Sequence, residues 1–265
     1  LMARTSPDLV SAPGQTSRTF PVWMNMKAKP LDDVRVRRAI LAAIDRKAMI
    51  GGAVDGFGTP IGSFYTPGSL GYVDTTGINL AWNEDEDIIH LTGSNADAKT
   101  AELFEDFSCS HCADLYLATE EQAIEKIKAG EINIDLRPMT ALDQGQEGHS
   151  TKALAAELAM FANGDFSSAF TVRNYLFENQ QSAYNKYDND GFADLAADYG
   201  ASDQAVQDIR DGKFLETAKR MGDNNRKYQE DNTGEAWTPR VLVDGKDIED
   251  IQGKRDDWPE TLSQL

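Results

Sequence analysis

The stretch "FEDFSCSHCADLYLA", residues 104–118, contains both cysteines of this 265-residue chain. Cys109 and Cys112 are separated by two residues. The apolar segment that runs into the pair predicts a strand over residues 101–107, and the residues that follow predict a helix over residues 110–128. We therefore expect Cys109 at the junction where the strand ends and the helix begins.

Further elements are predicted on both sides of this unit. Strands are predicted over residues 88–91, 132–138 and 238–250, the last with an Asp-Gly turn that is a strong hairpin signal. Breaks rich in Asn, Asp and Gly separate helices that are predicted over residues 150–162, 167–179, 190–198, 203–210 and 212–228. A short final helix is predicted over residues 257–265. This order predicts an α/β domain with an inserted helical domain at about residues 150–229.

The cysteine pair has three possible roles: half of a metal site, a structural staple, or a redox couple. A structural zinc site needs four ligands, but the chain has no third cysteine, and its three histidines lack the short spacing of such sites. A staple over so short a loop constrains few unfolded conformations, and at a helix start it is strained. Strained, exposed disulfides are instead reactive. We predict a redox couple with no metal and no other cofactor.

Redox chemistry suits the start of a helix. The unpaired amides and the helix dipole favour a thiolate there, and a protonated imidazole at His111, beside Ser110, would add to this effect. Cys109 is then expected to be the exposed nucleophile, and Cys112, one turn into the helix, the resolving thiol. A stabilised thiolate stabilises the reduced form, so the disulfide becomes an oxidant.

A second feature lies far downstream, where Thr238 and Pro239 stand just before a predicted strand. A proline at this point can hold a cis peptide bond and leave backbone groups free for an extended substrate. The alternative is an ordinary proline at the entry of a strand. The first interpretation makes Thr238 and Pro239 candidate substrate-binding residues.

The charge of the chain changes near residue 80. Residues 1–80 carry 9 Lys/Arg and 6 Asp/Glu, whereas residues 81–265 carry 17 and 38. This asymmetry predicts a domain boundary near that point. In the first part, a strand over residues 19–26, a helix from about residue 36 and a loop rich in Gly, Pro and Thr indicate an α+β segment.

The overall composition excludes some classes of protein. With 26 basic against 44 acidic side chains and a net charge of −18, the chain lacks the basic surface that nucleic-acid binding needs. No apolar run approaches the roughly 20 residues of a membrane helix. The first residues lack the charged and apolar regions of a signal peptide, so none is expected there.

The two parts resemble different families. The segments "MNMKAKPLDDVRVRRAILAAIDRKAMI" (24–50) and "GTPIGSFYTPGSLGYVDTTG" (58–77) resemble an internal stretch of the extracellular dipeptide/oligopeptide-binding proteins of ABC importers. This resemblance covers about residues 6–79. Those proteins bind peptides between two lobes and are about twice as long as this chain. The resemblance therefore implies a fragment that cannot form such a cleft alone.

The segments "FEDFSCSHC" (104–112), "GHSTKAL" (148–154) and "TPRVLVDG" (238–245) resemble the DsbA-like thiol-disulfide oxidoreductases of the thioredoxin superfamily, particularly the actinobacterial ones. The resemblance covers residues 88–265. It implies a thioredoxin-like fold with an inserted helical domain, in which Cys109 and Cys112 are the active pair and Thr238 with a cis-Pro239 lies beside them. It also implies work outside the cytoplasmic membrane on newly exported proteins.

Two positions depart from the pattern of that family. His111 matches its usual dipeptide, but Ser110 replaces the commoner proline. Many thioredoxin-like proteins also keep a buried acid six residues before the first cysteine, and this chain has Leu103 there. Glu105 is the remaining candidate for a proton relay.

The leading hypothesis is an extracytoplasmic enzyme that oxidises or isomerises protein cysteines and is reoxidised by a membrane-bound or soluble redox partner. It divides the chain into a peptide-binding-protein-like fragment, residues 1–80, and a DsbA-like thioredoxin domain, residues 81–265. The alternatives are a peptide-binding module fused to a redox domain, and a chain composed from two unrelated sources.

Overall fold

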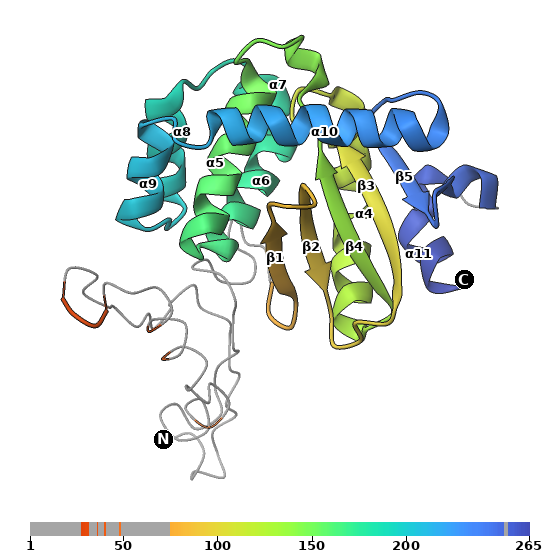
Figure 1. The fold of residues 1–265 in the computed structure, drawn as a ribbon. Coiled ribbons are helices and arrows are strands. Elements are labelled where there is room, and N and C mark those ends of the chain that lie inside the picture. The colour runs from red at the N-terminus through yellow and green to blue at the C-terminus, as the bar shows by residue number, and fades with distance from the viewer. Residues whose placement is uncertain (1–27, 32–35, 37–39, 41–47, 49–74, 252–253) are drawn as a thin grey trace, which may run out of the picture.

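The computed structural model describes residues 28–31, 36, 40, 48, 75–251 and 254–265 (Figure 1). The strand predicted for the first part lies outside the described residues, as do nearly all of its predicted helix and all but the last three residues of its predicted loop. None of the described helices is long and apolar enough to cross a membrane.

A six-stranded sheet with the order β1-β2-β4-β3-β5-β6 forms the centre of the molecule. β3 and β4 run parallel, and every other neighbouring pair in the sheet is antiparallel. The strands are β1 Asn79–Asn83, β2 Ile88–Thr92, β3 Lys99–Glu105, β4 Ile132–Pro138, β5 Arg240–Val243 and β6 Lys246–Asp247. The carboxyl ends of β3 and β4 therefore lie at the same edge of the sheet.

Helices cover both faces of the sheet, and Figure 1 shows α10 crossing one face while α4 lies on the other. Between β4 and β5 the chain forms a group of helices, which is the predicted insertion. The helices are α4 Ser110–Ala129, α5 His149–Asn163, α6 Phe166–Glu178, α7 Gln180–Ala183, α8 Asn189–Asp198, α9 Asp203–Arg210, α10 Leu215–Thr233 and α11 Trp258–Ser263. Short 3₁₀ helices are η1 Ala141–Asp143, η2 Ile248–Ile251 and η3 Arg255–Asp257.

Successive side chains of β3 point alternately to the two faces of the sheet. Leu103 and Glu105 face the cavity beneath α4, whereas Phe104 packs with Met139 and Leu242 on the other face. On that second face the ring of Phe104 stacks on Tyr228 of α10, with ring centroids 6.2 Å apart. Period-two alternation along a strand thus gives the sheet two separate apolar surfaces.

The inserted helices share the core of α4. The ring of Phe177, from α6, stacks on Phe107 at 5.1 Å and on Tyr116 of α4 at 4.8 Å between centroids. Phe107 lies in the loop between β3 and α4. The insertion therefore packs directly against the junction that carries the cysteines.

Among the strands and α-helices the sequence missed β1 and α7, and β1 crosses the predicted domain boundary. β1 begins at Asn79 and pairs along its whole length with β2, so residues 79 and 80 belong to the sheet although the prediction placed them in the first segment. We propose that the thioredoxin-like domain begins before β1. α7, a single turn, was also not predicted, because so short a helix shows no periodicity.

Candidate active site

Cys109 lies at the predicted junction of strand and helix. It is the N-cap residue of α4, with extended backbone angles, φ −85° and ψ 113°. Its carbonyl oxygen accepts the first hydrogen bonds of the helix, from the N–H of Cys112 at 3.0 Å and of Ala113 at 3.3 Å. The sulfur is therefore held where the backbone N–H groups of the first helical turn are unpaired.

Both cysteines are free thiols, and the loop before β5 lies over the first of them. The Sγ of Cys109 donates a hydrogen bond to the carbonyl oxygen of Thr238 at 3.4 Å, and the bond between Thr238 and Pro239 is cis. Cys109 is 8% exposed and Cys112 is 2% exposed. The first thiol is thus more covered than its predicted role as an exposed nucleophile implies, because Thr238 lies against it.

The two thiols differ strongly in acidity. A hydrogen bond from the Cys112 thiol is the main cause that lowers the pKa of Cys109 from 9.0 to about 5, and hydrogen bonds from the side chain of Thr238 and from two helix N–H groups add to it. Burial raises the pKa of Cys112 well above its ordinary value, and its hydrogen bond to Cys109 raises it further. At neutral pH the pair is therefore one thiolate beside one protonated thiol.

The two residues between the cysteines face solvent. The side chain of His111 is 75% exposed, and its Nδ1 lies 3.6 Å from Oδ2 of Asp114. Among the causes of the lowered pKa of Cys109, His111 contributes through a hydrogen bond from its backbone. The sequence predicts a further contribution from a protonated ring at His111, which stays a prediction, and the ring lies beside the carboxylate of Asp114. Ser110 is also exposed.

Asp106, in the loop before Cys109, organises the base of the site. Its carboxylate accepts hydrogen bonds from the N–H of Ser108 at 2.9 Å, from the N–H of Leu142 at 3.1 Å and from the hydroxyl of Ser150. Its own N–H donates to the Sγ of Cys112 at 3.4 Å. Burial raises the pKa of this carboxyl to about 6. One residue thus joins the β3–α4 loop, η1, α5 and the second thiol.

Gln180, at the start of α7, holds the same loop from the side of the insertion. Its amide nitrogen donates to the carbonyl oxygens of Phe107 and Cys109, both at 2.9 Å. The inserted helices therefore fix the backbone on which the first thiol is mounted.

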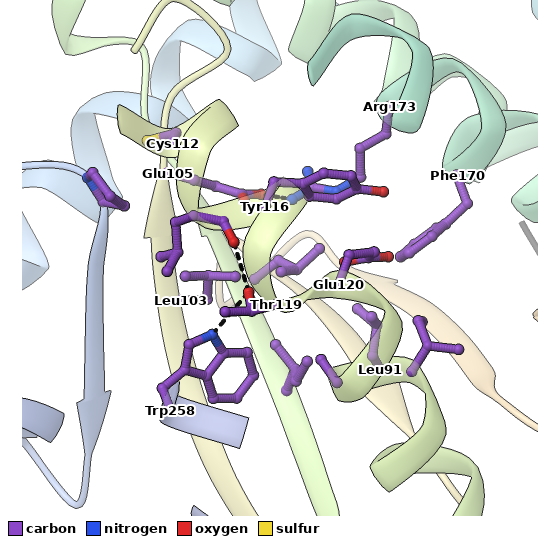
Figure 2. Close-up of a pocket in the computed structure, with 16 residues that line it drawn as sticks. Leu91, Leu103, Glu105, Cys112, Tyr116, Thr119, Glu120, Phe170, Arg173 and Trp258 are labelled. Atoms are coloured by element: carbon purple, nitrogen blue, oxygen red, sulfur yellow. Dashed lines mark hydrogen bonds and ion pairs between the residues drawn. The ribbon is translucent and has the colours of Figure 1, made fainter. Parts of the chain in front are cut away.

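A cavity of about 20 Å³ lies behind Cys112, between α4 and the sheet (Figure 2). This volume is enough for roughly one water molecule. Figure 2 shows Cys112 and Glu105 at one end, with Tyr116 and Arg173 beside them and Glu120 farther along α4. The cavity thus brings ionisable groups to within reach of the buried thiol.

A cluster of three carboxyls and one guanidinium lies here, with Glu105, Glu157 and Arg173 buried and Glu120 half-buried. Arg173, from α6, pairs with Glu105 and lies 3.7 Å from Oε1 of Glu157. Burial raises the pKa of Glu120 and of Glu157 to about 7, against the opposing charge of Arg173. The cluster, defined as Glu105, Glu120, Glu157 and Arg173, therefore holds protons near neutral pH.

The family model described as thioredoxin matches residues 86–263. The chain belongs to the thioredoxin family. It is similar to MdbA, a thiol-disulfide oxidoreductase from Corynebacterium diphtheriae, with 34% identity, 70% of this chain and 94% of that chain covered, and a TM-score of 0.65. It is also similar to MdbA from Corynebacterium matruchotii, with 31% identity, coverage of 69% and 90%, and a TM-score of 0.63.

A more distant structure, MdbA from Actinomyces oris, shares the fold at 18% identity, with 67% of this chain and 85% of that chain covered and a TM-score of 0.52. No curated protein matches the chain. A second family model, the middle part of bacterial extracellular solute-binding proteins, family 5, matches residues 3–97. This thioredoxin-family chain is accordingly a thiol-disulfide oxidoreductase whose first segment is similar to another family.

In this thioredoxin-family site, the structure brings together the sequence candidates Cys109, Cys112 and Thr238, and Pro239 lines the cavity behind Cys112. Of the two positions considered for a proton relay, Leu103 also lines that cavity but has no titratable group, whereas Glu105 is paired with Arg173. Sequence reasoning missed Asp106 and Gln180. An acid at the end of an apolar strand was a signal for Asp106, but nothing local marks Gln180, which acts across a separation of 71 residues.

Proposed function

We propose that the chain oxidises or isomerises cysteines of other proteins through the Cys109-Ser110-His111-Cys112 couple. The observation that carries this proposal is the difference in acidity between the two thiols, with a pKa of about 5 at Cys109 and a strongly raised one at Cys112. The two Corynebacterium relatives, named as thiol-disulfide oxidoreductases, support it.

The reaction begins with the disulfide form of the pair. A substrate thiolate attacks the Sγ of Cys109, the bond between Cys109 and Cys112 breaks, and Cys112 leaves as a thiolate that takes up a proton. A second thiolate of the substrate then attacks the substrate sulfur of the mixed disulfide, and Cys109 leaves as a thiolate. Two electrons pass from the substrate to the pair, and the low pKa of Cys109 makes it the better leaving group.

The proton that Cys112 needs has a nearby source. The cavity behind Cys112 is lined by Glu105 and Glu120, and the cluster of three carboxyls and Arg173 holds protons near pH 7. We assign the exchange of this proton with Cys112 to Glu120, and not to Glu105 or to the position of Leu103. The cavity that Cys112 and Glu120 both line has room for roughly one water molecule.

Thr238 and Pro239 are proposed to receive the substrate backbone. The carbonyl oxygen of Thr238 already contacts the Sγ of Cys109, so a chain that reaches that sulfur runs beside this backbone. Substrates are unfolded or newly exported proteins with free thiols, and a separate redox partner restores the disulfide. We place this work outside the cytoplasm, where disulfides persist.

In the main alternative interpretation, the first segment binds a peptide and determines the function of the chain. A peptide-binding module is supported by the match of residues 3–97 to solute-binding proteins. That segment covers a minor part of the chain, whereas the redox pair lies in the part that matches the thioredoxin family over residues 86–263. We therefore propose a redox domain preceded by a segment of separate origin.

Oxidation of reduced insulin by the disulfide form of the whole chain tests the proposal. Turnover is expected in the presence of a small disulfide, and Cys109→Ala is expected to abolish it. Cys112→Ala cannot form the internal disulfide, so the small disulfide should leave Cys109 in a mixed disulfide with its own thiol, visible as an added mass that a reductant removes. Unchanged turnover in Cys109→Ala would refute the assignment of the nucleophile.

A further inference from the structure

The topology of the sheet gathers three loops around Cys109. β3 and β4 are parallel and end together, with Glu105 opposite Pro138, and the antiparallel β5 begins at the same edge, with Arg240 opposite Phe104. The loops that follow β3, follow β4 and precede β5 therefore share one end of the molecule, where Figure 1 also places α7.

Three large apolar side chains are exposed at this end of the molecule: one in the loop after β4, one in the loop before β5 and one directly after α7. We name these three the apolar rim: Leu142 is 52% exposed, Tyr184 is 53% exposed and Trp237 is 38% exposed. Isolated exposed apolar residues are ordinary, but three around one reactive sulfur form a candidate contact surface.

Hydrogen bonds to neighbouring side chains hold two of the rim residues in place. The N–H of Leu142 donates to Asp106, and the N–H of Trp237 donates to the side chain of Gln229 at 2.6 Å. The guanidinium of Arg240 lies 3.6 Å from the centre of the Trp237 ring. A surface that is already ordered loses little entropy when a partner binds.

Tyr184 is tied to the same site from the side of the insertion. Its ring packs on His149 at 5.5 Å between centroids, and α7, which precedes it, begins with the Gln180 that holds the carbonyl of Cys109. Leu142 and Tyr184 are thus linked to the Cys109 loop through Asp106 and Gln180, and Trp237 directly precedes Thr238, whose carbonyl oxygen contacts the Sγ of Cys109.

Exposed acids accompany the rim. Residues 106–116, 138–149, 178–184 and 233–239 contain no lysine or arginine. The same segments carry four exposed carboxylates, which we name the acidic border: Asp114, Glu147, Glu178 and Glu235. A surface of this sign repels anionic lipid and a second copy of this chain, whose net charge is −18.

We propose that the apolar rim and its acidic border receive a segment of unfolded polypeptide in which a cysteine is flanked by basic and by aromatic or aliphatic residues. This inference rests on the proposed function and specifies its substrate class. The apolar side chains lie on Leu142, Tyr184 and Trp237, and the basic ones meet the acidic border. The border speeds encounter, and the rim prolongs contact while sulfur exchange occurs.

Synthetic peptides with one pair of cysteines test this preference. Three peptides share a Leu and a Trp beside the cysteines and differ in carrying Lys, Gln or Glu as flanking residues. The rate at which the disulfide form of the whole chain oxidises each peptide is divided by the rate with bis(2-hydroxyethyl) disulfide. This division removes the effect of flanking charge on the peptide thiols themselves.

At low salt we expect the Lys peptide to be oxidised about 10-fold faster than the Glu peptide after this normalisation, and the ratio to shrink in 1 M salt. Glu147→Gln with Glu235→Gln should lower the ratio several-fold. The matched control, Asp97→Asn with Glu125→Gln, removes two exposed acids remote from the border and should leave the ratio unchanged. Trp237→Ala should slow the Lys peptide but spare an analogue that lacks the Leu and the Trp.

Equal normalised rates for the three peptides would overturn the inference while leaving the proposed function intact. A preference that both double variants reduce equally would also overturn it, because the net charge of the chain, not the border, would then act. If none of the peptides is oxidised, both the inference and the proposed function fail.

Discussion

The sulfur atoms of Cys109 and Cys112 are chemically different because one precedes the helix and the other lies within it. Cys109 ends the β3–α4 loop, where the first N–H groups of α4 and the thiol of Cys112 stabilise negative charge. Cys112 lies one turn later in the core, where burial outweighs the hydrogen bond from the N–H of Asp106 and disfavours a thiolate. Placement at the junction is thus what separates a nucleophile from a resolving thiol.

This difference predicts the pH dependence of alkylation. In the reduced protein, the rate at which iodoacetamide modifies Cys109 should rise with a midpoint near the pKa of about 5. Cys112 should stay unmodified at neutral pH, because burial raises its pKa well above the ordinary value. Peptide mapping by mass spectrometry after timed quenching gives both rates. A midpoint near the ordinary thiol pKa of roughly 8.5 would contradict the proposed site.

Gln180 offers a second test at the residue scale. Gln180→Ala removes the donor to the carbonyl oxygens of Phe107 and Cys109, and should lower the free energy of unfolding by about 1–2 kcal/mol. The neighbouring Gln181 is exposed, so Gln181→Ala is the matched control and should change stability by less than about 0.5 kcal/mol. Urea unfolding measures both, and equal effects would show that the two bonds contribute nothing.

At this scale the sequence predicts what is local and misses what is distant. The spacing of Cys109 and Cys112 and the strand and helix around them were sufficient to indicate a redox couple. The direction of the His111 ring was not, because it depends on which neighbour, here Asp114, a long exposed side chain meets. Gln180 was missed for the same reason: its partners lie more than 70 residues away.

Among the elements, α6 connects the insertion to the chemistry. Its Arg173 is 2% exposed, and its guanidinium lies 5.0 Å from the centre of the Phe177 ring and pairs with Glu105 of β3. A charge taken out of water this far is tolerated only with partners of opposite sign. The insertion thus supplies the counterion for the carboxyls behind Cys112.

Arg173→Met should therefore destabilise the protein, and by an amount that depends on pH. The loss should be about 3–5 kcal/mol at pH 8, where the uncompensated carboxyls are ionised. The pKa of Glu120 and of Glu157 is raised to about 7 in the folded protein. Protonation of these carboxyls therefore stabilises the fold at low pH, and this stabilisation is lost as the pH rises through 7. The loss should accordingly be smaller at pH 5.5.

Arg210→Met is the control for this experiment. Arg210 pairs with Asp190 and Asp194 on the surface, where its side chain is 40% exposed, and its removal should cost less than about 1 kcal/mol. Urea midpoints at the two pH values give the comparison. A loss in Arg173→Met that is independent of pH would indicate a packing role without electrostatic coupling.

For the whole molecule, periodicity predicted the order of the elements better than their limits. The alternation of strands and the positions of the inserted helices followed from patterns of period 2 and 3.6, and each predicted helix of the insertion has a counterpart within a few residues. The sequence did not predict β1, because this strand is defined by its pairing with β2 and not by its own composition. The charge break near residue 80 therefore falls inside the sheet.

The reduced and oxidised forms of the whole molecule should differ in how their stability depends on pH. In the folded reduced form the pKa of Cys109 is lowered from 9.0 to about 5. The stability from its thiolate is therefore fully present above the unfolded pKa, and it is lost as the pH falls toward 5. The disulfide form has no such group, so its stability lacks this slope.

The difference in free energy of unfolding, reduced minus oxidised, should then rise with pH between 5 and 9. Between these two pKa values the slope is about 1.4 kcal/mol per pH unit, because one proton is lost from the folded thiol but not from the unfolded one. Closure of the short loop by the disulfide adds an offset that does not vary with pH, so the slope isolates the thiolate. Urea titrations of both forms at five pH values measure it. Cys109→Ala forms no disulfide, so it is a control for the reduced form alone, and its stability should lack the rise that the thiolate gives. A flat difference would mean that the folded protein does not stabilise the thiolate, and the disulfide would then be no stronger an oxidant than an unstructured one.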